Sequence, residues 1–230
     1  MPNFNILKTH TTENSFRVQS VRDLFSLNKL EVAETFEGCI PIEDTDWNIG
    51  VIVGGSGTGK TTIARECFGK NLISSFAYIK NSVIEDMPGE YSATEIGEVF
   101  TSVGFASPHS WLKSYAILST GEKMRVDLAR AMLESGEFFV FDEFTSVVDR
   151  QIAKTGAMAI AKAVRRRGNK FIAITCHYDV LEYLQPDWIY DTNEKKFFFP
   201  HLSDQNSNSM CMKIHMIKSR YGSSLASIII

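Results

Sequence analysis

The sequence has little of what would mark an extracellular or membrane-spanning protein. Its 230 residues include 4 cysteines, at positions 39, 67, 176 and 211, and their spacing forms no pairs. Scattered cysteines argue against a disulfide framework or a zinc site and suit a reducing compartment. No stretch approaches the roughly 18 consecutive apolar residues of a membrane helix, and charged side chains interrupt the first residues before any signal-like apolar run. We therefore expect a cytoplasmic protein with no membrane segment.

An excess of charge of one sign is also missing. The 27 acidic and 24 basic side chains give a net charge of -3. This near-balance lacks the broad positive field of a dedicated nucleic-acid binder. Arg165, Arg166 and Arg167 form a basic cluster, but it falls where a helix is expected to end, and cations there complement the helix dipole. We read no strong nucleic-acid signal.

The hydrophobic fraction of 44% is sufficient for a packed core. Short β-branched or aromatic runs predict strands, and periodic segments predict helices; the expected strands are 49–53, 76–79, 138–141 and 171–175, and the expected helices are 61–68, 122–134 and 151–167. Because strands alternate with helices, an α/β fold with a mainly parallel sheet follows.

The remaining segments complete the expected organisation. Residues 1–50 suggest a few short strands, and residues 186–199 suggest a hairpin. We expect one domain over 1–200, with a small helical insertion at about 81–135. The polar stretch after it opens a linker and tail over 201–230, which could be the truncated start of another domain.

A glycine-rich loop follows the 49–53 strand and matches the pattern G-x-x-x-x-G-K-[ST]. Glycines let backbone N–H groups turn toward phosphate oxygens, and the following helix presents its positive end. Lys60 can reach the β- and γ-phosphates of ATP, and the Thr61 hydroxyl can ligate Mg²⁺. The expected ATP contacts are Gly54, Gly55, Ser56, Gly57, Thr58, Gly59, Lys60, Thr61 and Thr62.

Two adjacent acids end the 138–141 strand and supply what a phosphate loop still needs. Asp142 is expected to hold Mg²⁺ together with Thr61, and Glu143 to orient and polarise the attacking water.

Residues 118–125 read LSTGEKMR, directly before a predicted helix. This resembles the LSGGQ signature of ABC-type ATPases: Ser119 and Gly121 match its serine and second glycine, while Thr120 and Glu122 replace its first glycine and glutamine. SVVD at 146–149 is similar to the family's D-loop, and His177 lies where the family carries its switch histidine.

The resemblance implies a P-loop NTPase fold of ABC type in which two subunits sandwich ATP. It implies that Ser119 and Gly121 bind the γ-phosphate held by the partner subunit, and that Asp149 acts across the interface. It implies a hydrogen bond from His177 to the γ-phosphate. For stacking on adenine the family uses an aromatic residue before the phosphate loop; Phe25 fits this position best, with Phe36 and Trp47 as competitors.

The chain also departs from the family. Residues 62–117 contain no glutamine, so the usual Q-loop residue is absent, and Asn81 is the nearest substitute. This weakens the interpretation as an ABC transporter subunit, which stays an alternative, as does a slow nucleotide-dependent switch. Residues 104–132, 141–150 and 175–191 resemble the ATPase module that some bacterial and phage proteins carry upstream of a GNAT-type acetyltransferase domain. The expected partners are therefore a second copy of the chain and an acetyltransferase-like or other protein that ATP hydrolysis drives.

Overall fold

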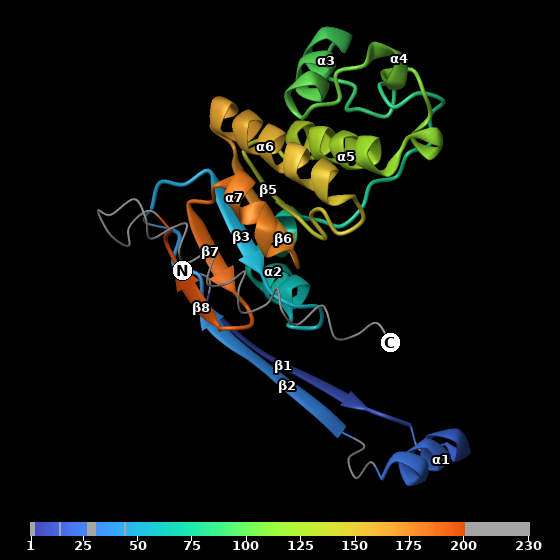
Figure 1. Cartoon of the computed structure of the whole chain (residues 1–230), viewed down its shortest axis with the longest axis vertical. Helices are drawn as coiled ribbons and strands as arrows, with labels where there is room; N and C mark the ends of the chain where they lie inside the picture. The colour runs from blue at the N-terminus through green and yellow to red at the C-terminus, as the bar shows by residue number, and fades with distance from the viewer. Residues whose placement is uncertain (1–2, 14, 27–30, 44, 201–230) are drawn as a thin grey trace.

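A six-stranded sheet forms the centre of the protein, as seen in a computed structural model (Figure 1). The structure describes residues 3–13, 15–26, 31–43 and 45–200. In sheet order the strands are β4 (Leu72–Ile73), β5 (Phe138–Phe141), β6 (Lys170–Thr175), β3 (Ile49–Val53), β7 (Trp188–Asp191) and β8 (Lys196–Phe198). Only the β7–β8 pair among these is antiparallel. The α/β fold with a mainly parallel sheet is therefore confirmed.

The two faces of the sheet pack against different layers. The helices are α2 (Lys60–Phe68), α3 (Ala93–Ser102), α4 (Pro108–Trp111), α5 (Thr120–Glu134), α6 (Arg150–Arg167) and α7 (Leu181–Leu184), with single 3-10 turns η1 (Gly69–Asn71), η2 (Tyr115–Ile117) and η3 (Tyr178–Val180). Alternate side chains of a strand point to opposite faces. Val51 and Val53 accordingly join the core formed with α3, α5 and α6, whereas Ile52 joins the core formed with α2.

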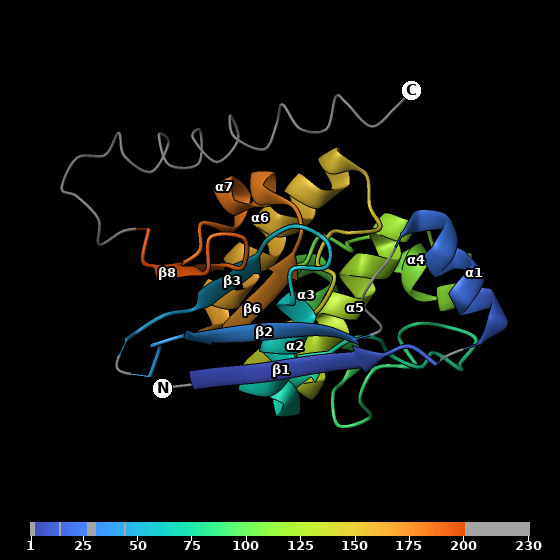
Figure 2. The ribbon, with the colours of Figure 1, turned by 90° about the horizontal axis from the view of Figure 1, so that it is seen from below.

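A long hairpin arm extends from the sheet, carrying a helix at its tip (Figures 1 and 2). Its antiparallel strands are β1 (Asn3–Thr11) and β2 (Glu31–Cys39), and the helix is α1 (Phe16–Phe25). The base of the arm packs on the sheet, where the rings of Phe4 and Tyr190 meet edge to face at 5.7 Å. Residues 1–50 do contain strands, as expected, but β1 and β2 are each nine residues long and not short. The helix between them was not expected: α1 follows the Ser15 N-cap and buries no residue, so no core-facing pattern marked it.

The strand expected at 76–79 is also wrong. The edge strand is β4, and residues 74–79 follow it without regular structure. Their aromatic side chains are used in another way: the ring of Tyr78 stacks on Tyr115 at 3.8 Å, and both hydroxyls donate to Asp127 on α5. The aromatic residues of this segment therefore pack against a helix and do not form a strand of the sheet. The tail over 201–230 lies outside the described residues.

A glycine in β3 allows the central strands to approach. Gly50 pairs with Trp188, and a Cβ atom at Gly50 would lie 2.0 Å from the fully buried indole. We expect Gly50→Ala to lower the free energy of unfolding by about 1–3 kcal/mol, because the indole has no room to move. Denaturant unfolding measures this. Gly89→Ala is the control: a Cβ there meets nothing within 4 Å, so stability should change by less than about 0.5 kcal/mol. Equal losses in both variants would contradict the packing argument.

Candidate functional site

The glycine-rich loop joins β3 to α2 and curls over the start of the helix. Gly59 is the N-cap of α2 with a left-handed φ of 85°, a conformation that favours glycine. A Cβ there would also lie 2.3 Å from the ring of Phe36. The Lys60 ammonium folds back and donates to the Gly55 carbonyl at 2.6 Å. The loop thus adopts a turn around its own lysine, with the N-terminus of α2 directly behind it.

A side chain in the first turn of α2 and one directly after β5 form an oxygen pair. The Thr61 hydroxyl donates to Asp142 Oδ1 at 3.2 Å across 81 positions of sequence. The same oxygen accepts the Glu143 N–H at 2.9 Å, and Asp142 is only 9% exposed. In the described part of the chain, no group of three or more His, Cys, Asp or Glu side chains could hold a metal ion. Two protein oxygens beside a phosphate loop instead suit Mg²⁺, which usually keeps several waters and takes substrate phosphate oxygens as ligands.

The turn after Asp142 contains unusual backbone geometry. Glu143 and Thr145 have positive φ angles of 52° and 68°. Non-glycine residues adopt this region at a cost, and such outliers cluster at functional sites. Phe144 and Thr145 are buried, and the Phe144 N–H donates to Ile174 at 2.8 Å, so the turn is held in place. Its result is an exposed Glu143 carboxylate next to a buried Asp142.

His177 faces this turn from the end of β6. Its Nδ1 atom lies 3.3 Å from the Thr145 hydroxyl. Burial, and then the positive charge of Arg150, lower the pKa of His177; the Glu143 carboxylate raises this pKa, and the Lys60 ammonium lowers it. The imidazole therefore senses both a phosphate-loop charge and the exposed acid, as expected if the three groups surround one site.

The signature segment forms the start of α5. Ser119 is its N-cap in a capping box: the Ser119 hydroxyl accepts from the Glu122 N–H at 3.3 Å, and Glu122 Oε2 accepts from the Ser119 N–H at 3.0 Å. These bonds from Ser119, backbone first, lower the pKa of Glu122. Gly121 is buried, and a Cβ there would lie 2.8 Å from Ile152 of α6. The Ser119 hydroxyl and N–H therefore bond within the first turn of α5, to Glu122.

Asp149 is the N-cap of α6, and its carboxylate accepts from the Gln151 N–H at 2.8 Å. Thr62, in the first turn of α2, accepts a hydrogen bond from Lys8 of the arm. Both side chains therefore have local partners within the subunit.

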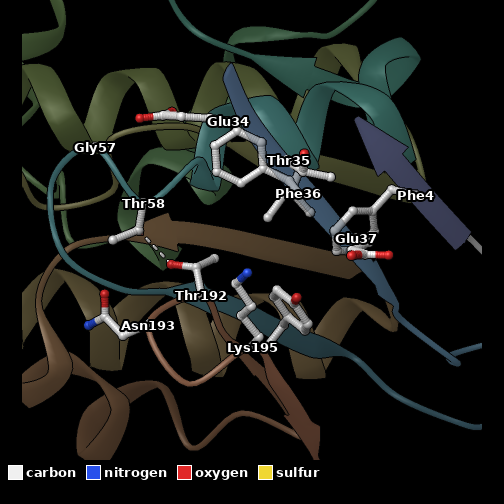
Figure 3. Close-up of a pocket in the computed structure, with 12 residues that line it drawn as sticks. Phe4, Glu34, Thr35, Phe36, Glu37, Gly57, Thr58, Thr192, Asn193 and Lys195 are labelled. Atoms are coloured by element: carbon white, nitrogen blue, oxygen red, sulfur yellow. Dashed lines mark hydrogen bonds between the residues drawn. The ribbon is translucent and has the colours of Figure 1, made fainter. Parts of the chain in front are cut away.

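A cavity of about 380 Å³ lies between the arm and the phosphate loop (Figure 3). Phe36 and Glu37 line it from β2, Thr58 from the loop, and Asn193 and Lys195 from the β7–β8 turn.

The placement of the aromatic residues does not support the expectation that Phe25 stacks on adenine. Phe25 lies at the end of α1, is 66% exposed, and sits at the tip of the arm away from α2 (Figure 1). Trp47 is buried between Trp188 and Phe138. Phe36 alone of the three lines the cavity, because the antiparallel pairing of β1 and β2 returns the chain to the loop after α1.

Sequence reasoning missed the β7–β8 turn. Thr192 Oγ1 lies 2.6 Å from Thr58 Oγ1, and Asn193 Oδ1 accepts the Gly55 N–H at 3.1 Å. The segment was expected only as a hairpin, and nothing local in TNEK predicts contact with a loop about 135 positions earlier.

Comparison with known proteins shows a similarity in fold. The fold resembles the dimeric structure of the ATP-binding cassette MJ0796 bound to ADP and Pi, with a TM-score of 0.57 and 14% identity, covering 82% of this chain and 92% of that one. The chain has the fold of an ATP-binding cassette. A bacterial Atm1-family ABC exporter with ATP bound is also similar, at a TM-score of 0.50 and 20% identity, over 68% of this chain and 33% of the exporter.

Sequence similarity to known proteins is more local. The chain is 41% identical over 56 residues to an uncharacterized ABC transporter ATP-binding protein, y4gM, of Sinorhizobium fredii. That match covers 24% of this chain and 10% of the relative, so the chain matches only a small part of that protein. No family model matches the sequence. Among the described residues, no helix combines the length and the apolar character needed to cross a bilayer.

The charges around His177 can be tested by NMR titration of its imidazole. We expect a pKa below the ordinary value of about 6.5. Glu143→Gln should lower this pKa further, because the carboxylate stabilises the imidazolium, and Lys60→Ala should raise it, because a nearby positive charge is lost. Glu98→Gln, on the exposed side of α3, is the control and should leave the His177 pKa unchanged. A His177 pKa insensitive to both site variants would contradict the arrangement.

Proposed function

We propose that this cassette binds ATP with Mg²⁺ and hydrolyses it. The observation that carries the proposal is the contact of Thr61 with Asp142 beside a loop already turned around Lys60. A glycine-rich turn alone could be structural. A hydroxyl from the first turn of α2 and a buried carboxylate that follows β5 form the oxygen pair that a magnesium–phosphate site requires.

Each residue has a distinct role in this proposal. Lys60 and the loop N–H groups would bind the β- and γ-phosphates, and Thr61 and Asp142 would hold Mg²⁺, which would neutralise phosphate charge. Glu143, exposed just after β5, would accept a hydrogen bond from a water molecule and orient the oxygen of that water toward the γ-phosphorus. As the water oxygen bonds to the γ-phosphorus and the water proton passes to Glu143, the bond from that phosphorus to the oxygen shared with the β-phosphate would break, leaving ADP and phosphate. His177 donates a hydrogen bond to the γ-phosphate and places it in line with that water.

The adenosine would occupy the cavity beside Phe36. We expect Phe36→Ala to weaken ATP binding by about 1–3 kcal/mol, the range for loss of a base-stacking ring. Phe25→Ala should leave binding unchanged, because that ring lies at the tip of the arm. Binding is measured by calorimetry with ATP and with inorganic tripolyphosphate. Because Phe36 also touches Gly59, a loss for both ligands would point to a damaged loop, and a loss for ATP alone to stacking.

We further propose a homodimer that encloses two ATP molecules. The support is that Ser119 bonds to Glu122 at the start of α5, where the first turn of the helix offers N–H groups to an anion. Asp149 would lie at the same interface. The resemblance to a dimeric cassette agrees with this assembly. Hydrolysis would remove the γ-phosphate that joins the subunits.

Glu143→Gln is expected to trap the closed dimer with ATP, because the amide keeps the shape of the site but no longer activates water. Sedimentation velocity should give a dimer with ATP and a monomer with ADP. Ser119→Arg, which puts bulk and charge in the interface, should stay monomeric with ATP while still binding it. A Glu143→Gln monomer with ATP, at concentrations where the parent protein hydrolyses ATP, would exclude the homodimer.

What the closing and opening of the dimer would drive is a separate proposal. An acetyltransferase-like or other protein partner fits the resemblance of residues 104–132 and 141–150. The similarity to y4gM, which is named a transporter ATP-binding protein, favours a transporter subunit as the second candidate. The absence of a glutamine from residues 62–117 argues against that candidate. Partners captured from the native host by the Glu143→Gln protein would decide between a membrane protein and another protein.

A further inference from the structure

The turn between β7 and β8 is fastened to the first half of the phosphate loop. The Thr192 N–H donates to the Val53 carbonyl at 2.8 Å, and its hydroxyl lies 2.6 Å from that of Thr58. The approach is so close that a Cβ atom at Gly54 would lie 2.0 Å from the Thr192 hydroxyl oxygen. The glycine at this position therefore serves the turn as well as the phosphates.

Asn193 connects this turn to two elements at once. Its Oδ1 accepts the N–H of Gly55 at 3.1 Å, and its amide nitrogen donates to the Tyr178 hydroxyl at 2.9 Å. Gly55 is the residue whose carbonyl accepts from the Lys60 ammonium. One amide side chain thus reaches from the residue that holds Lys60 to the segment that follows His177.

Tyr178 is itself held by a buried acid. Its hydroxyl lies 3.1 and 3.0 Å from the two oxygens of Asp191, which is 2% exposed. The Asn193 and Glu194 N–H groups donate to the same carboxylate at 2.8 and 3.2 Å. A buried carboxylate satisfied in this way is rigid, because losing any one partner leaves part of its charge unpaired.

We propose that Tyr178 and Asn193 are positioning residues that hold His177 and Lys60 in register within one subunit. The path runs from His177 through its neighbour Tyr178, across Asn193 to Gly55, and from the Gly55 carbonyl to Lys60. In this role Asn193, which also lines the cavity, acts through Gly55 and not through contact with ATP. The inference rests on the proposed ATP hydrolysis, in which His177 and Lys60 contact the same phosphate.

The test is steady-state hydrolysis by Tyr178→Phe and Asn193→Ala. We expect each variant to lower kcat about fivefold, the effect of one lost hydrogen bond that orients a catalytic group. KM for ATP and the calorimetric affinity should change by less than about twofold, because the loop N–H groups and Lys60 remain. The control is Tyr91→Phe, which removes a hydroxyl bonded at 3.2 Å to the Leu133 carbonyl and should leave kcat unchanged.

The double variant separates a shared path from two local defects. If both residues act through the same link, Tyr178→Phe with Asn193→Ala should lower kcat about fivefold, not the roughly 25-fold of independent effects. Unchanged kcat in both single variants, independent effects in the double variant, or a loss of kcat in Tyr91→Phe equal to theirs would overturn the link. A parent protein that neither binds nor hydrolyses ATP would instead overturn the proposed function, on which the link depends.

Discussion

The parallel pairing of β3 between β6 and β7 is the constraint on which the site depends. All five residues of β3 are buried, and the register sets Val53 beside Thr175 on one side and Asp191 on the other. The three strands end at the same edge of the sheet, so the phosphate loop, the segment carrying His177 and the β7–β8 turn lie next to one another. A slip of one residue in either pairing would turn every side chain to the wrong face.

A second set of pairings brings in the acids. β5 lies between β4 and β6, with Phe141 opposite Ile73 and Ala173. This register delivers Asp142 to Thr61 and directs the turn after it toward His177. The positive φ angles of Glu143 and Thr145 are tolerated there because Phe144 and Thr145 are buried and bonded to neighbouring elements. The cost of the strained turn is offset by core packing, and the result is an exposed Glu143 beside the Thr61–Asp142 oxygen pair.

The helical layer couples packing to docking in a similar way. Gly121 lets α5 approach α6 at Ile152, and the same glycine stands in the first turn, where N–H groups point outward. Glu122 caps this turn with an ionised carboxylate, which stabilises the helix but places negative charge close to where a partner's phosphate would bind. In the proposed dimer, the stability of α5 and the affinity for a second subunit would therefore be opposed at this position.

Local chemistry determined much of this protein. The phosphate loop, the acidic pair and the segment 118–125 that starts α5 could be identified from the sequence, since each depends on residue types at short, regular spacings. Long-range geometry decided the rest. Phe36 lies beside the loop, and Phe25 does not, because β1 and β2 pair and carry α1 away. Phe76 and Tyr78 pack on α5 instead of forming a strand, and Thr192 and Asn193 reach the phosphate loop because β7 neighbours β3. Strand order and register arise from the packing of the whole chain, and no short window of sequence contains them.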